Sequence, residues 1–211
     1  MKILMVLAGT PPSKTLLQTE MIEADLVLAV DGGFNGFQKY KLQPDLLLGD
    51  MDSVTMNEEP LEYLDLPDQD RTDLQKALDY VFKTFSIQSI TFLGGGGVRT
   101  DHLLHNLHIC ASIDPAIKII FKNEISLDKD ISIEIIQRIT PQCEFDLRVR
   151  EATILSVLPI CDYQGLNSEG LKWEIKNKDR ASGFISQSNQ TVKDDPAFRI
   201  RSGCAYIAVY Q

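Results

Sequence analysis

Residues 26–33 read Leu-Val-Leu-Ala-Val-Asp-Gly-Gly, an apolar run of strand length that ends at an acidic turn. The pattern recurs at 46–53, Leu-Leu-Leu-Gly-Asp-Met-Asp-Ser, and Asp101 follows a third apolar run and the glycines 94–97. Near-continuous apolar strands are typical of a parallel sheet covered on both faces. Because parallel strands end at the same edge, we expect these acidic residues to gather on one rim, where open α/β folds bind ligands.

The first half of the chain alternates between strand and helix patterns. A helix over 74–85 has the clearest pattern, because apolar residues recur at helical spacing and Thr72 with Gln75 forms a capping box at its start. The other predicted helices cover 13–24, 34–40 and 101–112, and the predicted strands cover 2–8, 26–30, 46–48, 62–66, 89–93 and 117–121.

After about residue 123, apolar and polar residues alternate with a period of two, which indicates antiparallel strands. The candidates cover 131–135, 145–149, 153–160, 171–175, 183–186 and 205–210. We therefore predict an α/β fold class, in which a parallel-sheet domain over residues 1–123 precedes a smaller all-β, sandwich-like domain over residues 124–211.

The composition of the chain argues against several classes of function. A formal net charge of −9 over 211 residues argues against a nucleic-acid-binding protein, because Lys and Arg supply most of that affinity. No apolar run approaches the roughly 20 residues of a membrane-spanning helix, and residues 2–8 read as a strand rather than a signal peptide. The four cysteines are Cys110, Cys143, Cys161 and Cys204. They form no Cys-x-x-Cys pair and indicate neither a zinc site nor disulfides, so we expect a cytoplasmic protein.

Asp50 and Asp52 are candidate metal ligands. Two residues apart on an extended chain, their carboxylates point to one face, and Mg²⁺ is typically held by carboxylates, water and phosphate oxygens. An isolated Asp-x-Asp is more often a solvated turn, but the other acidic clusters nearby favour a metal site.

Asp73 and Asp70 lie near the start of the helix over 74–85. Complementation of the helix dipole would explain each of them alone. It does not call for the density of acidic residues in Asp68-Gln69-Asp70-Arg71-Thr72-Asp73, so we place this segment on the same rim.

The glycine run offers bare backbone amides between a strand and a helix, which suits phosphate, and Arg99 adds a cation beside it. A flexible surface loop is the alternative. The three histidines, His102, His105 and His108, spread over about 200° of a helix and are not expected to share one ion, although His102 is placed to reach the rim.

Several aspartates facing a phosphate would repel it unless divalent cations lie between them. Metal bridging with an arginine clamp is the common machinery of phosphoryl transfer, so the implied ligand is a metal-nucleotide complex. A carboxylate without metal would accept the proton of an attacking hydroxyl group.

At these residues the chain resembles the thiamine pyrophosphokinase family. The resemblance rests on three segments with the family's order and spacing: Gly49 to Ser53, Asp68 to Asp73 with Lys76-Ala77-Leu78 behind it, and Arg99-Thr100-Asp101-His102 with Asn106 behind it. It implies transfer of the pyrophosphoryl group of ATP to the hydroxyethyl oxygen of thiamine, which gives thiamine diphosphate and AMP, with Mg²⁺ as cofactor.

The resemblance also implies roles for individual residues. The metal set is Asp50, Asp52, Asp73 and Asp101, and the catalytic set is Asp73, Asp101 and Arg99. The nucleotide side comprises Asp31, Gly32, Gly33, Gln69, Thr72, Arg99 and His102. Which aspartate is the general base, and how many metal ions bind, stay open.

For the second domain the resemblance implies thiamine binding and a homodimer. Ser186, Ser188 and Asn189 resemble the family's substrate motif, and Tyr206 or Trp173 would supply an aromatic platform for thiamine's cationic rings. Met51 and Val98 depart from the family pattern. The alternatives are a pyrophosphokinase for another hydroxyalkyl heterocycle, such as a hydroxymethylpterin, and a non-catalytic sensor of metal-ATP.

Overall fold

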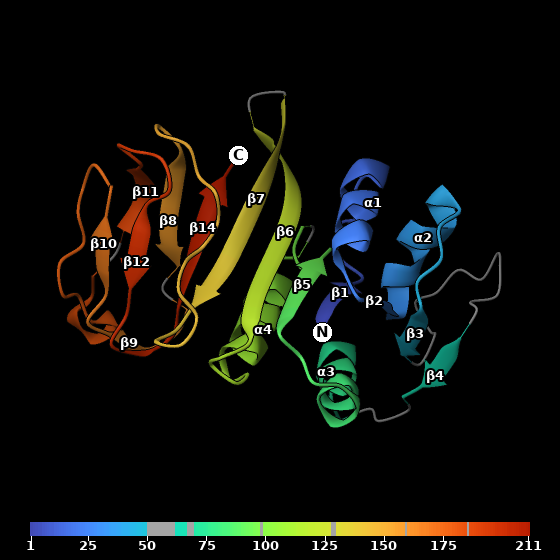
Figure 1. Ribbon diagram of the computed structural model, residues 1–211. Helices are drawn as coiled ribbons and strands as arrows, with labels where there is room; N and C mark the ends of the chain where they lie inside the picture. Colours follow the sequence, from blue (N-terminus) through green and yellow to red (C-terminus); the bar gives the residue numbers. More distant parts are fainter. Residues whose placement is uncertain (50–61, 67–69, 98, 128–129, 159, 185) are drawn as a thin grey trace. The chain divides into compact units, whose positions relative to one another are not determined.

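The computed structural model (Figure 1) describes residues 1–211 except 50–61, 67–69, 98, 128–129, 159 and 185. It divides into two compact units, residues 1–106 with 122–124, and residues 107–121 with 125–211. The predicted division at residues 123 and 124 differs from this one, because 107–121 group with the second unit. The assignment of domains to these ranges stays a prediction.

The first unit is a parallel sheet with the strand order β5-β1-β2-β3-β4. β1, β2 and β3 are almost entirely buried, as their apolar sequences predict, whereas Tyr63 on the edge strand β4 is 42% exposed. β1 and β3 contain no charged residue except Lys2 at the edge. The strands are β1 (Lys2–Val6), β2 (Leu26–Val30), β3 (Leu46–Gly49), β4 (Tyr63–Asp65) and β5 (Ser89–Leu93).

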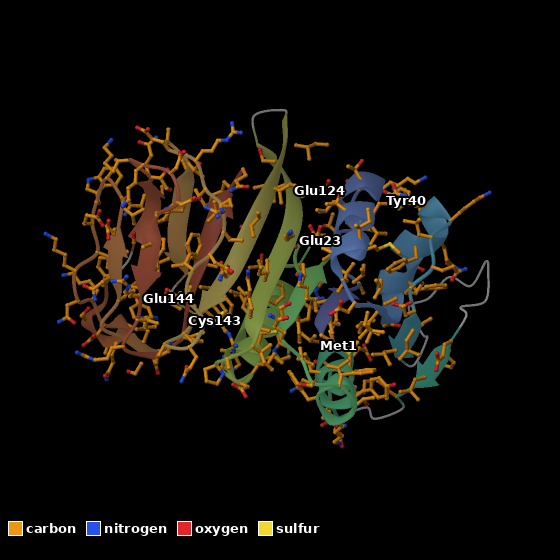
Figure 2. All side chains as sticks on the ribbon, viewed as in Figure 1. Met1, Glu23, Tyr40, Glu124, Cys143 and Glu144 are labelled. Atoms are coloured by element: carbon orange, nitrogen blue, oxygen red, sulfur yellow. The ribbon has the colours of Figure 1, made fainter. Side chains whose placement is uncertain are left out.

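Helices follow the strands of this unit. In the view of Figure 1, α1 and α3 lie on opposite sides of the strands, which explains why both faces of the sheet are apolar. The helical elements are α1 (Lys14–Glu23), η1 (Asp31–Gly33), α2 (Phe34–Tyr40), α3 (Asp73–Thr84) and α4 (Thr100–Ala111). Two contacts hold the start of α1 and the segment before it. The Ser13 amide donates to Glu124 at 2.6 Å, and the Tyr40 hydroxyl donates to the Pro12 carbonyl at 3.2 Å; Figure 2 labels Glu124 and Tyr40.

The second unit is rich in strands, so the predicted α/β part followed by a β part is confirmed. Its larger sheet has the order β11-β8-β14-β7-β6, and two short pairs, β10 with β12 and β9 with β13, accompany it. The strands are β6 (Lys118–Leu127), β7 (Asp130–Ile139), β8 (Ile154–Leu158), β9 (Tyr163–Gln164), β10 (Asn167–Glu169), β11 (Ser186–Gln190), β12 (Ala197–Arg199), β13 (Ser202–Gly203) and β14 (Ala205–Tyr210), with a short helix η2 (Arg180–Ser182).

One apolar core joins the large sheet to the smaller elements of this unit. Val157 and Ile207 from the large sheet belong to the same cluster as Phe198 of β12 and Leu171 and Ile175 from loops. This arrangement is the packing of a sandwich, in which two layers bury their apolar faces against each other.

Two predicted strands are absent from the part of the chain that the structure describes. Residues 145–149 and 171–175 lie in irregular backbone, although Phe145, Val149, Leu171 and Ile175 point into the core. In 145–149 the alternation therefore reflects burial of alternate side chains rather than pairing into a ladder. In 171–175, Leu171 and Ile175 are buried but Trp173 between them is 58% exposed, and Leu171 forms only an isolated bridge with Thr191. Of the predicted strand 183–186, only Ser186 belongs to a strand, β11.

Candidate functional site

A cavity of about 520 Å³ lies at the carboxyl ends of β1, β2 and β5. It is bounded by the loops that follow these strands, by the start of α3 and by the first half of α4. The structure thus brings Asp31, Asp73 and Asp101 to one site. The lining residues are Leu7, Ala8, Gly9, Val30, Asp31, Thr72, Asp73, Leu74, Gly94, Gly95, Asp101, His102, His105 and Asn106.

The glycine run forms one wall of this cavity. The ladder between β1 and β5 continues into it, because the amide of Gly9 donates to the Gly94 carbonyl at 2.9 Å and that of Thr10 to the Gly96 carbonyl at 3.0 Å. The Asn106 side chain donates to the Gly95 carbonyl at 2.9 Å. Gly94 and Gly95 line the cavity, and in the described part of the chain the Gly95 amide donates to no backbone carbonyl.

Close backbone approach explains the glycines near Asp31. A Cβ on Gly33 would lie 2.0 Å from the Val6 carbonyl oxygen, so only glycine fits there. Asp31 has a left-handed φ of 45° and is buried, with 5% of its surface exposed. Gly49, at the end of β3, lies against Asp31: a Cβ added to Gly49 would be 3.2 Å from the Asp31 Cα. The end of this strand is therefore beside the site. Gly32 lies between Asp31 and Gly33 in η1.

Thr72 fixes the position of Asp73. Its hydroxyl accepts from the Gln75 amide at 3.3 Å, and the Gln75 side chain accepts from the Thr72 amide at 3.0 Å, so the predicted capping box is present. Asp73 is therefore the first residue of α3, where its carboxylate complements the helix dipole and lines the cavity.

Lys76 lies in a segment that carries the family resemblance, but from the sequence it has no predicted role of its own. Its side chain is only 3% exposed, and its ammonium group lies 2.7 Å from Asp73 Oδ1. It also donates to the Leu66 carbonyl at 2.8 Å. A buried ammonium group is stable only with such partners, and here it counters the charge of the acidic rim. Exposed Asp–Lys pairs on helices have the same three-residue spacing. The sequence alone therefore cannot distinguish this buried pair from an ordinary surface pair.

Asp101 is held by Arg99. The guanidinium group forks onto its carboxylate, with Nε 3.1 Å from Oδ1 and Nη2 2.5 Å from Oδ2, and both side chains are 64% exposed. The hydrogen bond from Arg99 keeps the pKa of Asp101 below its usual value, and the carboxylate raises the pKa of Arg99. The predicted phosphate cation is thus paired with a carboxylate in this structure. His102 and His105 line the same cavity, whereas His108 lines another.

Asn189, one of the predicted substrate residues of the second unit, binds the backbone of Trp173 and is joined to Ser186. Asn189 is 2% exposed, and its side-chain amide pairs with both backbone groups of Trp173: it accepts from the amide at 3.2 Å and donates to the carbonyl at 2.8 Å. Buried Ser186 accepts from the same Asn189 amide at 3.3 Å. The Trp173 ring is 58% exposed, and the Lys172 ammonium lies 4.8 Å from its centroid.

Ser188 and Tyr206 have different surroundings. Ser188 has a φ of 52° in the bulge of β11, where its amide donates to Ser156 at 3.0 Å and its side chain is exposed. Tyr206 is fully buried, and its hydroxyl donates to the Leu107 carbonyl at 2.7 Å. Within this chain Tyr206 packs in the core, and the exposed ring beside the motif belongs to Trp173.

Three predicted site residues, Asp50, Asp52 and Gln69, lie outside the described residues. In the part of the chain that the structure describes, no three His, Cys, Asp or Glu side chains form a group that could hold a metal ion. None of its described helices is long and apolar enough to cross a membrane.

Two family models match the chain. The model "Thiamin pyrophosphokinase, catalytic domain" matches residues 17–121, and the model "Thiamin pyrophosphokinase, vitamin B1 binding domain" matches residues 142–206. Thiamin pyrophosphokinase 1 of Caenorhabditis elegans is 27% identical over 177 residues, which cover 77% of this chain and 70% of that protein.

Solved structures of similar fold cover nearly the whole chain. Yeast thiamin pyrophosphokinase superposes with a TM-score of 0.75 at 17% identity, covering 99% of this chain and 86% of that one. Thiamine pyrophosphokinase from Bacillus subtilis superposes with a TM-score of 0.72 at 23% identity, covering 99% and 98%. At these identities the superpositions establish the common fold.

Proposed function

The chain belongs to the thiamin pyrophosphokinase family, enzymes that transfer pyrophosphate from ATP to thiamine, and from this premise we propose how its residues divide the work. The observation that carries the proposal is the cavity in which Asp31, Asp73 and Asp101 face the glycine run. Acidic side chains opposite glycine backbone amides suit a metal-bound triphosphate, because the amides bind phosphate and the carboxylates bind cations.

Mg²⁺ is the proposed cofactor. The side chains at the rim offer carboxylate oxygens, which are the ligands that Mg²⁺ prefers, and Asp73 and Asp101 would hold it together with Asp50 and Asp52. Bound there, the ion would neutralise phosphate charge.

Residues of the chain itself orient the reactants. The ammonium group of Lys76 holds the Asp73 carboxylate at the cavity, and Arg99 holds Asp101. Whichever of these two carboxylates is left without metal would accept the proton of the thiamine hydroxyl as it attacks the β-phosphorus and AMP leaves. Asp31, Gly32, Gly33, Gln69, Thr72, Arg99 and His102 are proposed for the nucleotide side.

Thiamine is proposed to bind at the Trp173 platform with Ser186, Ser188 and Asn189 around it. Asn189 sets the backbone of Trp173, so the motif would act by fixing an exposed aromatic ring as well as by contacting substrate. A homodimer and a cytoplasmic location complete the proposal. The location is supported by the four cysteines, all of which are free thiols.

The activity is tested by incubating the protein with ATP and Mg²⁺ and either thiamine or a hydroxymethylpterin, and by quantifying AMP and the diphosphorylated product. We expect AMP and thiamine diphosphate in equal amounts, only with thiamine. Formation of ADP would indicate an ordinary kinase, AMP with the pterin alone would change the acceptor, and no turnover would contradict the proposal.

Replacing Trp173 with alanine is expected to raise KM for thiamine about tenfold, because a cationic ring system loses its aromatic partner. The Phe variant should keep most of the affinity. Steady-state kinetics with each substrate varied in turn will test this, and KM for ATP serves as the internal control. An Ala variant with the KM of the native protein for thiamine would exclude Trp173 from the site.

A further inference from the structure

A second cavity, of about 740 Å³, lies within the second unit and has no role in the function proposed above. Two cysteines, Cys161 and Cys204, are part of its lining. Apart from the cysteines, its charged and titratable lining groups are three basic residues, His108, Arg138 and Arg201, and one acidic residue, Asp162. The cavity therefore combines two thiols with a surface that favours anions.

The backbone brings the two cysteines close together. The Cys204 amide donates to the carbonyl of Asp162, the residue after Cys161, at 3.2 Å, and so extends the antiparallel pairing of β9 with β13. Both thiols are free, and both line the same cavity. Directly opposite residues of antiparallel strands have Cα atoms about 4.5–5.5 Å apart, so Cys161, one residue before Asp162, lies near Cys204, and the shared cavity places both side chains on the same side.

The surroundings of the pair favour a thiolate at Cys204. Interaction with the Cys161 thiol lowers the pKa of Cys204, and the positive charge of Arg138 acts in the same direction, while burial and the Asp162 carboxylate oppose them. Arg138 is fully buried, and in the described part of the chain its partners are backbone carbonyls and not carboxylates, so its charge is not cancelled. By contrast, burial raises the pKa of Cys110 to about 12, which is typical of an unreactive thiol.

We propose that Cys161 and Cys204 are a modification site, a dithiol that a small carboxylate-bearing disulfide oxidises from within this cavity. The Cys204 thiolate attacks one sulfur of the small disulfide, whose S–S bond breaks and releases the first small thiol. Cys161 then gives up its proton and attacks Cys204 Sγ, which releases the second small thiol. Two protein thiols are oxidised, and one small disulfide is reduced to two thiols.

The experiment uses the full chain and oxidised glutathione as the probe. After incubation, the remaining thiols are alkylated under denaturing conditions, and the digest is analysed by mass spectrometry. We expect a peptide pair joined through Cys161 and Cys204, lighter by two hydrogen atoms than the reduced pair, loss of alkylation at these positions only, and reversal by dithiothreitol.

Cys143 supplies the matched control, because it is partly exposed, lies beside Glu144 in the turn after β7 (Figure 2), and is not part of the cavity lining. The Cys143→Ser variant should form the same link, and Cys161→Ser should accumulate glutathione on Cys204. If Cys143 in the native protein is glutathionylated while no link between Cys161 and Cys204 forms, the proposal is wrong. Both observations are made on the native protein, so this test does not depend on whether a variant folds.

Discussion

Replacing Asp101 with asparagine is expected to lower kcat at least about a hundredfold with little change in the fold, and Asp73→Asn should have an effect of the same order. Each substitution keeps the shape of the side chain and removes the charge that the proposed metal and the substrate proton require. Asp101 is exposed, and its partner Arg99 lowers its pKa, so the native carboxylate is charged at neutral pH and the loss is a loss of charge.

The measurement is the initial rate of AMP formation with saturating ATP and thiamine. Asp79→Asn is the matched control: Asp79 lies on α3 like Asp73, but it pairs with Arg71 and Lys83 on the exposed surface. Circular dichroism and the thermal midpoint of each variant separate a catalytic loss from unfolding. Rates near those of the native protein in both the Asp73 and Asp101 variants would remove these residues from the site.

Arg138→Met is expected to destabilise the protein by about 3–5 kcal/mol, the sum of several buried acceptors left unpaired, which would lower the thermal midpoint by roughly 10 °C. The guanidinium group donates at 2.7–2.8 Å to the carbonyls of Cys110, Ile113, Asp114 and Ile117, which follow one another at and beyond the end of α4. Methionine fills much of the same volume but leaves these carbonyl groups without a donor. Unpaired buried carbonyl groups are costly, since water cannot replace the lost bonds.

Denaturant unfolding of Arg138→Met is compared with that of Arg148→Met. Arg148 also forms a short ion pair, 2.6 Å from Asp195, but its side chain is 91% exposed, so its replacement should change the stability by less than about 1 kcal/mol. Arg138→Lys should be intermediate or worse, because one ammonium group cannot reach four carbonyls. Equal stability of the Arg138 and Arg148 variants would show that the four hydrogen bonds contribute little.

Local patterns predicted the elements of the first unit well. The capping box at Thr72 and the apolar stripe of α3 were recognisable because a helix start depends on side chains three residues apart. The parallel strands were recognisable because both faces are buried. In the second unit, residues 145–149 alternate like a strand but have no neighbouring strand to pair with. Whether such a neighbouring strand is present depends on residues far away in the sequence.

The sequence by itself determined which residues end the strands of the first unit, and therefore that Asp31, Asp73 and Asp101 share a rim, because parallel topology places all strand ends together. Only the tertiary structure decided which polar side chains are buried. The sequence motifs that contain Lys76 and Asn189 did not reveal that these side chains are buried, and Arg138 belongs to no motif. From inside the protein Lys76, Asn189 and Arg138 hold a carboxylate, the backbone of Trp173 and the carbonyl groups at a helix end, respectively. The physical reason is that burial, and the hydrogen bonds and ion pairs that buried polar groups require, arise from contacts between segments distant in the chain. The local spacing of residues carries no information about such contacts.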